Sequence, residues 1–177
     1  MNINETLKHY FGYDSLRPGQ QELIEGILQR KDVLGIMPTG AGKSLCYQVP
    51  ALMLDGITIV VSPLISLMTD QVKALNQTGV HAAYINSSLT ENQIRTALFY
   101  AAQGRYKIIY VAPERLNTMR FLEFACQVDI SMVTVDEAHC ISQWGQDFRP
   151  SYVGIADFLA QLPKRPVVSA FTATATE

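Results

Sequence analysis

The chain has 177 residues, of which 48% are hydrophobic and 17% are charged, and its formal net charge at pH 7 is −2. This length predicts about one domain, and this composition excludes an intrinsically disordered chain. Because 14 basic residues are balanced by 16 acidic ones, a nucleic-acid partner would have to be held by a local patch and not by a general positive field.

The cysteines and the start of the chain indicate the compartment. Cys46, Cys126 and Cys140 are far apart and form no C-x-x-C pair, which argues against a disulfide framework or a zinc site and suits a reducing cytosol. The start lacks a basic segment followed by an apolar run, so no secretory signal is visible, and no apolar stretch approaches the roughly 18 residues of a membrane span. We expect an intracellular protein with no membrane partner, cytoplasmic in a bacterium or nuclear in a eukaryote.

Short apolar runs alternate with helical patterns from about residue 33 onward. Runs that are apolar at nearly every position are typical of strands buried on both faces of a parallel sheet. The predicted strands are VLGI (33–36), ITIVV (57–61), AAYI (82–85), KIIYV (107–111), MVTV (132–135) and VVSAF (167–171). The alternation predicts a doubly wound α/β fold, with a mostly parallel central sheet and helices on both faces.

The helices are predicted mainly from their starts. Thr90 with Gln93 forms a capping box, and Ser62 followed by Pro63 offers an N-cap and a proline at the first helical position. Further helices are expected at apolar positions within 23–28, from about Lys43, and from Pro150 to a stop at Pro163.

The segment MPTGAGKS (37–44) lies between a predicted strand and a predicted helix, which is where a phosphate loop belongs. The usual pattern begins with glycine, whereas this segment begins with Met37. That position falls at the strand end, before the cradle, and Gly40 and Gly42 supply the backbone freedom that the cradle needs. Lys43 would then reach the β- and γ-phosphates of a nucleotide, and the Ser44 hydroxyl would ligate Mg²⁺. The alternative is a glycine turn with an exposed lysine.

Two adjacent carboxylates follow the predicted strand 132–135, in the segment DEAH (136–139). Open α/β sheets bind their ligands at the carboxyl ends of the strands. We assign Asp136 to Mg²⁺ and Glu137 to the orientation and deprotonation of the attacking water, and His139 is placed to couple them to a neighbouring element. A solvated turn is the alternative. Together with the loop at 37–44, the pair predicts a Mg²⁺-dependent nucleoside triphosphatase.

The whole chain resembles the first RecA-like motor domain of RecQ-type ATP-dependent DNA helicases of superfamily 2. The resemblance rests on several segments in the right order: GYDSLRPGQQE, MPTGAGKS, VVSPLISLMTDQV, YVAPERL, DEAH, CISQWGQDFRPSY and FTATAT. The family's version of the phosphate loop carries methionine at its first position, as Met37 does. The resemblance implies one helicase ATP-binding domain at 1–177, in which 1–30 is an adenine-recognition segment.

The resemblance also implies roles for individual residues. Tyr13 would stack on adenine, Arg17 would pack nearby, and Gln20 would hydrogen-bond the edge of the base. The nucleotide-binding set becomes Tyr13, Arg17, Gln20, Thr39, Gly40, Ala41, Gly42, Lys43 and Ser44. Gln143 would sense the γ-phosphate, and Leu16 and Ala41 depart from the family's usual Phe and Gly.

An aromatic loop at 140–152 is the candidate nucleic-acid element. Trp144 and Phe148 would stack on unpaired bases, and Arg149 would pair with phosphate; Arg115, after the fourth predicted strand, would also lie on the DNA path. From the residues alone, burial of the two aromatic rings in the core is the alternative. The resemblance favours binding of single-stranded and partly duplex DNA.

The implied activity is ATP-driven 3′-to-5′ translocation and unwinding of duplex DNA in recombination and repair. Family members continue into a second motor domain, and that domain supplies an arginine finger. The 177-residue sequence does not include this second domain. Such a finger is worth roughly 10³–10⁵ in rate in comparable enzymes, so we expect this fragment to be nearly inactive alone. An RNA helicase of the same superfamily and a catalytically silent regulatory module remain the alternatives.

Overall fold

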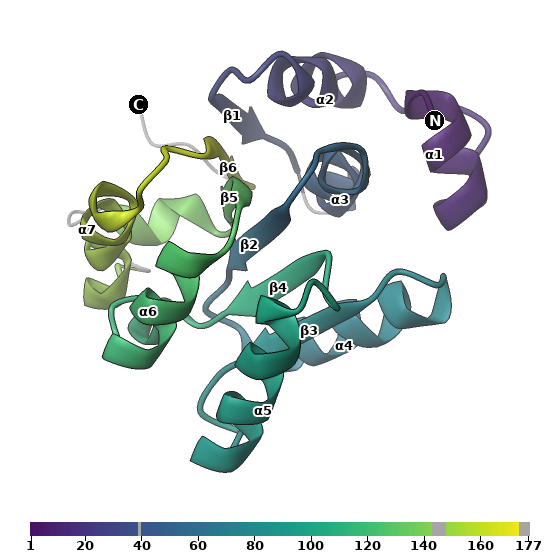
Figure 1. Cartoon of the computed structure of the whole chain (residues 1–177). Coiled ribbons are helices and arrows are strands. Elements are labelled where there is room, and N and C mark those ends of the chain that lie inside the picture. Colours follow the sequence, from purple (N-terminus) through teal and green to yellow (C-terminus); the bar gives the residue numbers. More distant parts are fainter. Residues whose placement is uncertain (39, 143–147, 174–177) are drawn as a thin grey trace.

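A computed structural model describes residues 1–38, 40–142 and 148–173. Helices and strands alternate along most of this chain (Figure 1). The elements are α1 (Ile3–Thr6), η1 (Leu7–Phe11), α2 (Gln20–Leu28), β1 (Val33–Ile36), α3 (Lys43–Met53), β2 (Ile57–Val61), α4 (Ile65–Gln77), β3 (Ala82–Ile85), α5 (Glu91–Ala102), β4 (Ile108–Val111), η2 (Pro113–Arg115), α6 (Met119–Gln127), β5 (Ile130–Val135), η3 (Ala138–Ile141), η4 (Pro150–Tyr152), α7 (Gly154–Gln161) and β6 (Val167–Thr172).

The six strands form one parallel sheet in the order β1-β6-β5-β2-β4-β3. All residues of β2, β4 and β5 are buried, as expected for central strands covered on both faces. The predicted parallel sheet is therefore confirmed. The predicted strand at 107–111 begins one residue later, the one at 132–135 begins two residues earlier, and the one at 167–171 ends one residue later.

Helices cover both faces of the sheet (Figure 1). Side chains of α2, α3 and α4 share one buried apolar cluster with one face of the strands, and those of α5, α6 and α7 share a second cluster with the other face. A smaller cluster, formed by Leu7, Ile24 and Val49, fixes the N-terminal helices on α3. Within the described residues, no helix combines the length and hydropathy needed to cross a bilayer.

Two helix predictions need correction. The turn after β2 does not begin a helix at Pro63: α4 begins at Ile65, and its N-cap Leu64 is extended. Ser62 is buried at the strand end, and its hydroxyl accepts a 3.4 Å hydrogen bond from the Leu64 amide, so it caps a turn before the helix. Pro150 opens a short 3₁₀ turn, and the α-helix itself begins at Gly154. The capping box of Thr90 and Gln93 is confirmed.

Candidate active site

A cavity of about 760 Å³ opens at the carboxyl edge of the sheet. It brings together residues from the N-terminal segment, the loop before α3 and the turn after β5, which are far apart in the sequence. Its lining includes Phe11, Tyr13, Arg17, Gln20, Gly40, Gly42, Lys43, Ser44, Asp136 and Glu137. Parallel α/β sheets place their ligands at this edge.

The loop between β1 and α3 has the geometry that a phosphate cradle requires. Gly40 and Gly42 have φ of +83° and +82°, a backbone conformation that residues other than glycine rarely adopt. Helix α3 begins directly after Gly42. Met37 precedes the cradle: it is buried, and its amide donates a 3.0 Å hydrogen bond to the Thr172 carbonyl. The first glycine of the usual pattern is therefore unnecessary here. Thr39, predicted in the loop, lies outside the described residues.

Lys43 connects the loop to the two carboxylates after β5. Its Nζ atom lies 3.0 Å from Oδ1 of Asp136 and 3.5 Å from Oε1 of Glu137. Burial alone would lower the pKa of Lys43, but attraction to Asp136 and then to Glu137 outweighs burial, so the pKa is raised above its ordinary value. The lysine is therefore a fixed positive charge between two acids.

The turn after β5 holds its carboxylates rigidly. Asp136 is only 3% exposed, its carboxylate accepts a 2.9 Å hydrogen bond from the Glu137 amide, and its carbonyl accepts a 2.7 Å hydrogen bond from the buried Tyr152 hydroxyl. Glu137 has φ of +52°, which is uncommon for a residue with a side chain and costs of order 1–3 kcal/mol. The contact made by Tyr152 is not predictable from the sequence, because nothing in the pattern identifies which backbone atom a distant tyrosine will contact.

His139 extends the site to the last strand. Its Nδ1 atom lies 3.4 Å from Oε2 of Glu137 and 2.9 Å from Oγ1 of Thr172 at the end of β6. The structure therefore places His139 between the carboxylate pair and a neighbouring strand, where its role was expected. Gln143, the expected γ-phosphate sensor, lies outside the described residues.

The N-terminal segment contacts the phosphate loop directly. An Arg17 guanidinium nitrogen donates a 2.7 Å hydrogen bond to the Gly40 carbonyl. The Gln20 amide nitrogen donates to the Gly42 carbonyl at 2.9 Å, and its oxygen accepts from the Arg17 amide at 2.7 Å. Gln20 and Tyr13 both line the cavity; Gln20 is 1% exposed and already bonded to the loop, whereas Tyr13 is 54% exposed.

The residues present fit a magnesium nucleotide. Ser44 and Asp136, the predicted metal ligands, both line the cavity with the loop. Among the described residues, no group of three or more His, Cys, Asp and Glu side chains is placed to hold a metal. Mg²⁺ suits such a site, because it is commonly held by one or two carboxylates together with water and phosphate oxygens.

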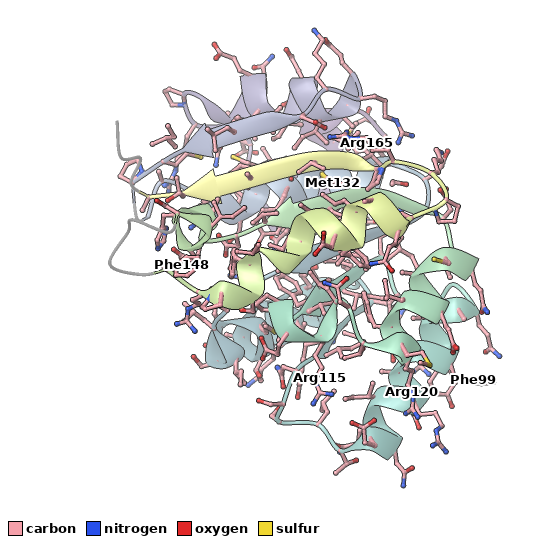
Figure 2. All side chains as sticks on the ribbon, turned by 90° about the vertical axis from the view of Figure 1, so that its left-hand side faces the viewer. Phe99, Arg115, Arg120, Met132, Phe148 and Arg165 are labelled. Atoms are coloured by element: carbon pink, nitrogen blue, oxygen red, sulfur yellow. The ribbon has the colours of Figure 1, made fainter. Side chains whose placement is uncertain are left out.

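A second cavity of about 550 Å³, which we call the loop groove, adjoins the first. Its lining residues are Pro63, Leu64, Glu137, His139, Cys140, Phe148 and Arg149. Glu137 lines both cavities. Figure 2 shows Phe148 at the side toward which the β6 arrow points, and Arg149 is exposed beside it. Phe148 is half-buried, so part of its ring packs against the domain and part lines the groove; Trp144 lies outside the described residues.

Arg115 is placed apart from the loop groove (Figure 2). Its guanidinium lies 3.5 Å from a Glu91 carboxylate oxygen, and Arg120 lies 3.4 Å from the other oxygen of the same carboxylate. For Arg115 to contact DNA as predicted, its guanidinium would have to leave or share this partly exposed ion pair with Glu91. The sequence did not indicate this pairing, because α5 and η2 are separated by a strand and its connections.

Comparisons with known proteins identify relatives. The family model described as "DEAD/DEAH box helicase" matches residues 17–177. The chain is 52% identical to the ATP-dependent DNA helicase RecQ of Bacillus subtilis over 96% of this chain and 29% of that protein. It is 47% identical to the RecQ of Haemophilus influenzae over 96% of this chain and 27% of that protein. The chain thus spans less than a third of the length of these two relatives.

Solved structures share the fold at low sequence identity. A hypothetical ATP-dependent RNA helicase from Sulfolobus tokodaii matches 100% of this chain and 52% of its own, with a TM-score of 0.76 and 23% identity. The Mycobacterium smegmatis helicase Lhr, bound to ssDNA and AMP-PNP, matches 96% of this chain and 24% of its own, with a TM-score of 0.75 and 19% identity. The chain therefore belongs to the DEAD/DEAH box helicase family, as a helicase domain whose sequence is similar to part of the RecQ-type DNA helicases.

Proposed function

We propose that the chain is the ATP-binding half of a DNA helicase motor that couples Mg²⁺-ATP hydrolysis to 3′-to-5′ translocation and to unwinding in recombination and repair. The observation that carries this proposal is the position of Lys43, 3.0 and 3.5 Å from the two carboxylates of Asp136 and Glu137 within one cavity. A lysine at a helix start, facing two acids at a strand end, is the arrangement that phosphoryl transfer requires.

The residues would divide the chemistry among them. Lys43 and the amides of the loop would bind the phosphates, because the start of α3 favours negative charge. Ser44 and Asp136 would hold Mg²⁺, which when bound neutralises charge on the phosphates. Glu137 would orient the attacking water and accept its proton. His139 would hold Glu137 in place through its 3.4 Å contact.

The loop groove is the proposed site for single-stranded DNA. Phe148 offers a half-buried ring on which a base would stack, worth roughly 1–3 kcal/mol, and the exposed Arg149 would pair with a phosphate. Trp144 would extend this path, and Arg115, which lies apart from the groove, would contact the DNA further along. The relatives named as DNA helicases support DNA over RNA. With DNA as substrate, we place the protein in the bacterial cytoplasm or the eukaryotic nucleus.

We further propose that a second motor domain, present in the full-length protein, completes the site. The relatives are more than three times as long as this chain. An arginine finger from that domain would contribute roughly 10³–10⁵ in rate. The isolated 177-residue chain would then bind nucleotide weakly and hydrolyse it very slowly.

The deciding experiment measures ATP hydrolysis by the 177-residue chain and by the full-length protein, each with single-stranded DNA, with single-stranded RNA and without nucleic acid. We expect turnover from the full-length protein only, stimulated by DNA and abolished by Lys43→Ala or Glu137→Gln. Lys73→Ala, on the exposed face of α4, is the matched control for loss of a lysine. Brisk hydrolysis by the short chain alone would overturn the divided site, and stimulation by RNA alone would favour an RNA helicase.

A further inference from the structure

A largely buried polar network borders the nucleotide cavity, which Gln48 lines, and joins three elements. On α3, Gln48 donates from one amide nitrogen to Oε1 of Gln71 on α4 at 2.8 Å and to the Tyr110 hydroxyl on β4 at 3.0 Å. The Tyr110 hydroxyl lies 3.3 Å from the Tyr47 hydroxyl. Gln48 and Tyr47 both belong to α3, the helix that begins with Lys43 and Ser44. The network therefore joins α3, which carries the proposed magnesium ligand Ser44, to β4 and α4.

The Gln48 amide is the centre of this network. The two hydrogens of the Gln48 amide are both taken, one by Gln71 and one by Tyr110. Burial raises the pKa of Tyr110 to about 12 and raises that of Tyr47 well above its ordinary value, so both hydroxyls keep their protons at neutral pH. Since Gln48 is 5% exposed, losing a partner would leave a polar group unsatisfied away from water, which is costly. The linked elements are therefore favoured to move together.

Among the described residues, those directly before α4 connect this network to the loop groove. The α4 residue Leu67 lines the nucleotide cavity, while the N-cap Leu64 lines the loop groove together with Pro63. Leu64 and Ile65 are exposed, so the amino-terminal end of α4 is open to a ligand in that groove. A displacement of this end would be felt at Gln71, less than two turns further along the helix.

We propose that Gln71 is a positioning residue that ties α4 to the helix carrying Lys43 and Ser44, so that single-stranded DNA in the loop groove changes the arrangement of the nucleotide site. The hydrogen bond from Gln48 to Gln71 directly links α3 to α4. This inference rests on the proposed function, because it assigns a nucleic acid to the loop groove and a nucleotide to the larger cavity. Gln71 itself lines neither cavity.

The test compares three variants of the full-length protein. Gln71→Leu removes the acceptor, whereas Gln71→Glu keeps an oxygen that accepts from Gln48. Gln77→Leu makes the same change as Gln71→Leu at an exposed position on α4 and controls for loss of a glutamine. ATP hydrolysis is measured with and without an oligothymidylate of fixed length, and kcat and KM for ATP are determined separately. Thermal unfolding of each variant reports whether the fold is intact.

We expect Gln71→Leu to lower the DNA-stimulated kcat about five- to tenfold, the effect of roughly one hydrogen bond, with basal hydrolysis and KM for ATP within twofold of wild type. Gln71→Glu should retain the stimulation, and Gln77→Leu should behave as wild type. Full stimulation in Gln71→Leu, equal loss in both Gln71 variants, or equal loss of basal and stimulated rates would each overturn the proposal. A wild-type protein that DNA does not stimulate would instead refute the proposed function, and the inference with it.

Discussion

The imidazole of His139 and the hydroxyl of Thr172 join the turn after β5 to the end of β6, with 2.9 Å between Nδ1 and Oγ1. The same nitrogen lies 3.4 Å from a carboxylate oxygen of Glu137. One ring therefore contacts both the proposed water-activating residue and the segment that leaves the sheet. We therefore expect a change at either contact to be transmitted to the other.

From this relationship we predict that Thr172→Val lowers DNA-stimulated ATP hydrolysis about tenfold, within the usual range of coupling between sites, and leaves KM for ATP unchanged. Valine keeps the shape and removes the hydroxyl. Thr172→Ser keeps the hydroxyl and is the control, for which we expect near wild-type rates. Steady-state kinetics of the full-length protein, with and without single-stranded DNA, distinguish the two. Equal rates in both variants would contradict a role for this contact.

Replacement of Lys43 should also change stability. We expect Lys43→Met to lower the free energy of unfolding by about 1–3 kcal/mol at pH 7, because it leaves the buried Asp136 carboxylate without its cation. The folded pKa of Lys43 is raised above its ordinary 10.5, so this stabilisation is fully present below that value and is lost as pH rises through the folded pKa.

Urea unfolding in steps from pH 7 to strongly alkaline conditions tests this prediction. The difference between wild type and Lys43→Met should shrink above about pH 10.5. The exposed control Lys73→Met should change the unfolding free energy by less than about 0.5 kcal/mol throughout. A difference that persists unchanged at the alkaline end would exclude an ionic origin.

The hydrogen bond from the Tyr152 hydroxyl to the Asp136 carbonyl should stabilise the turn that carries the two carboxylates. Tyr152→Phe removes the hydroxyl that donates to the Asp136 carbonyl while filling the same space, so no cavity forms. We expect a loss of about 1–2 kcal/mol in unfolding free energy and a lower kcat, since the backbone of the turn loses a restraint. Urea unfolding and single-turnover hydrolysis measure the two effects. Phe158→Leu, a buried change away from the turn, should affect stability without a matching change in kcat.

The ion pair between Asp32 and Arg165, at the amino ends of β1 and β6, should make the free energy of unfolding depend on pH in the acidic range. The hydrogen bond from Arg165 lowers the pKa of Asp32 and outweighs burial, and the Val168 amide adds to the lowering. A depressed pKa means that the stabilisation is present above the ordinary value of 3.8 and is lost as pH falls through the folded pKa. Asp32→Asn should therefore be less stable than wild type at pH 7 and equally stable in strong acid.

Thermal unfolding at neutral pH and at successively lower pH checks this prediction. Asp70→Asn, at an exposed position on α4, controls for the general effect of removing one negative charge. A gap between wild type and Asp32→Asn that stays constant down to strongly acidic pH would contradict the assignment to this carboxylate.

The strands were the most predictable part of the molecule, because a strand covered on both faces must be apolar at nearly every position. The runs at 57–61 and 82–85 match β2 and β3 at both ends. Helix α6 was not predicted, although its buried Phe121, Phe124 and Ala125 recur at helical spacing. No capping box or N-terminal proline marks its start at Met119, and its N-cap Thr118 makes no side-chain capping hydrogen bond.

The start of α4 was mispredicted for a different reason. Ser62 and Pro63 carry the usual marks of a helix start, but the serine is buried at the end of β2 and bonds to the turn. Local propensity was overridden by the tertiary position of the strand. Such departures are common near functional sites, and Pro63 lines the loop groove.

At the site, the sequence indicated which residues gather but not how they pair. The loop, the carboxylates and the histidine lie where their motifs placed them. Side-chain partners were not predictable: the Gln20 amide bonds to the phosphate loop, and the Arg115 guanidinium faces Glu91. Those contacts depend on the relative positions of elements far apart in the chain, which local patterns do not encode.

The pairing of β1 with β6 has a consequence for how the protein is made. Val33 lies opposite Ser169 in the sheet, although nearly the whole chain separates them. During synthesis the loop that follows β1 leaves the ribosome long before β6 exists, and the amide of Met37 finds its carbonyl partner only when Thr172 arrives. We therefore expect the loop to reach its nucleotide-binding geometry only once β6 has been synthesised, so ligand-dependent protection from protease should begin at that length.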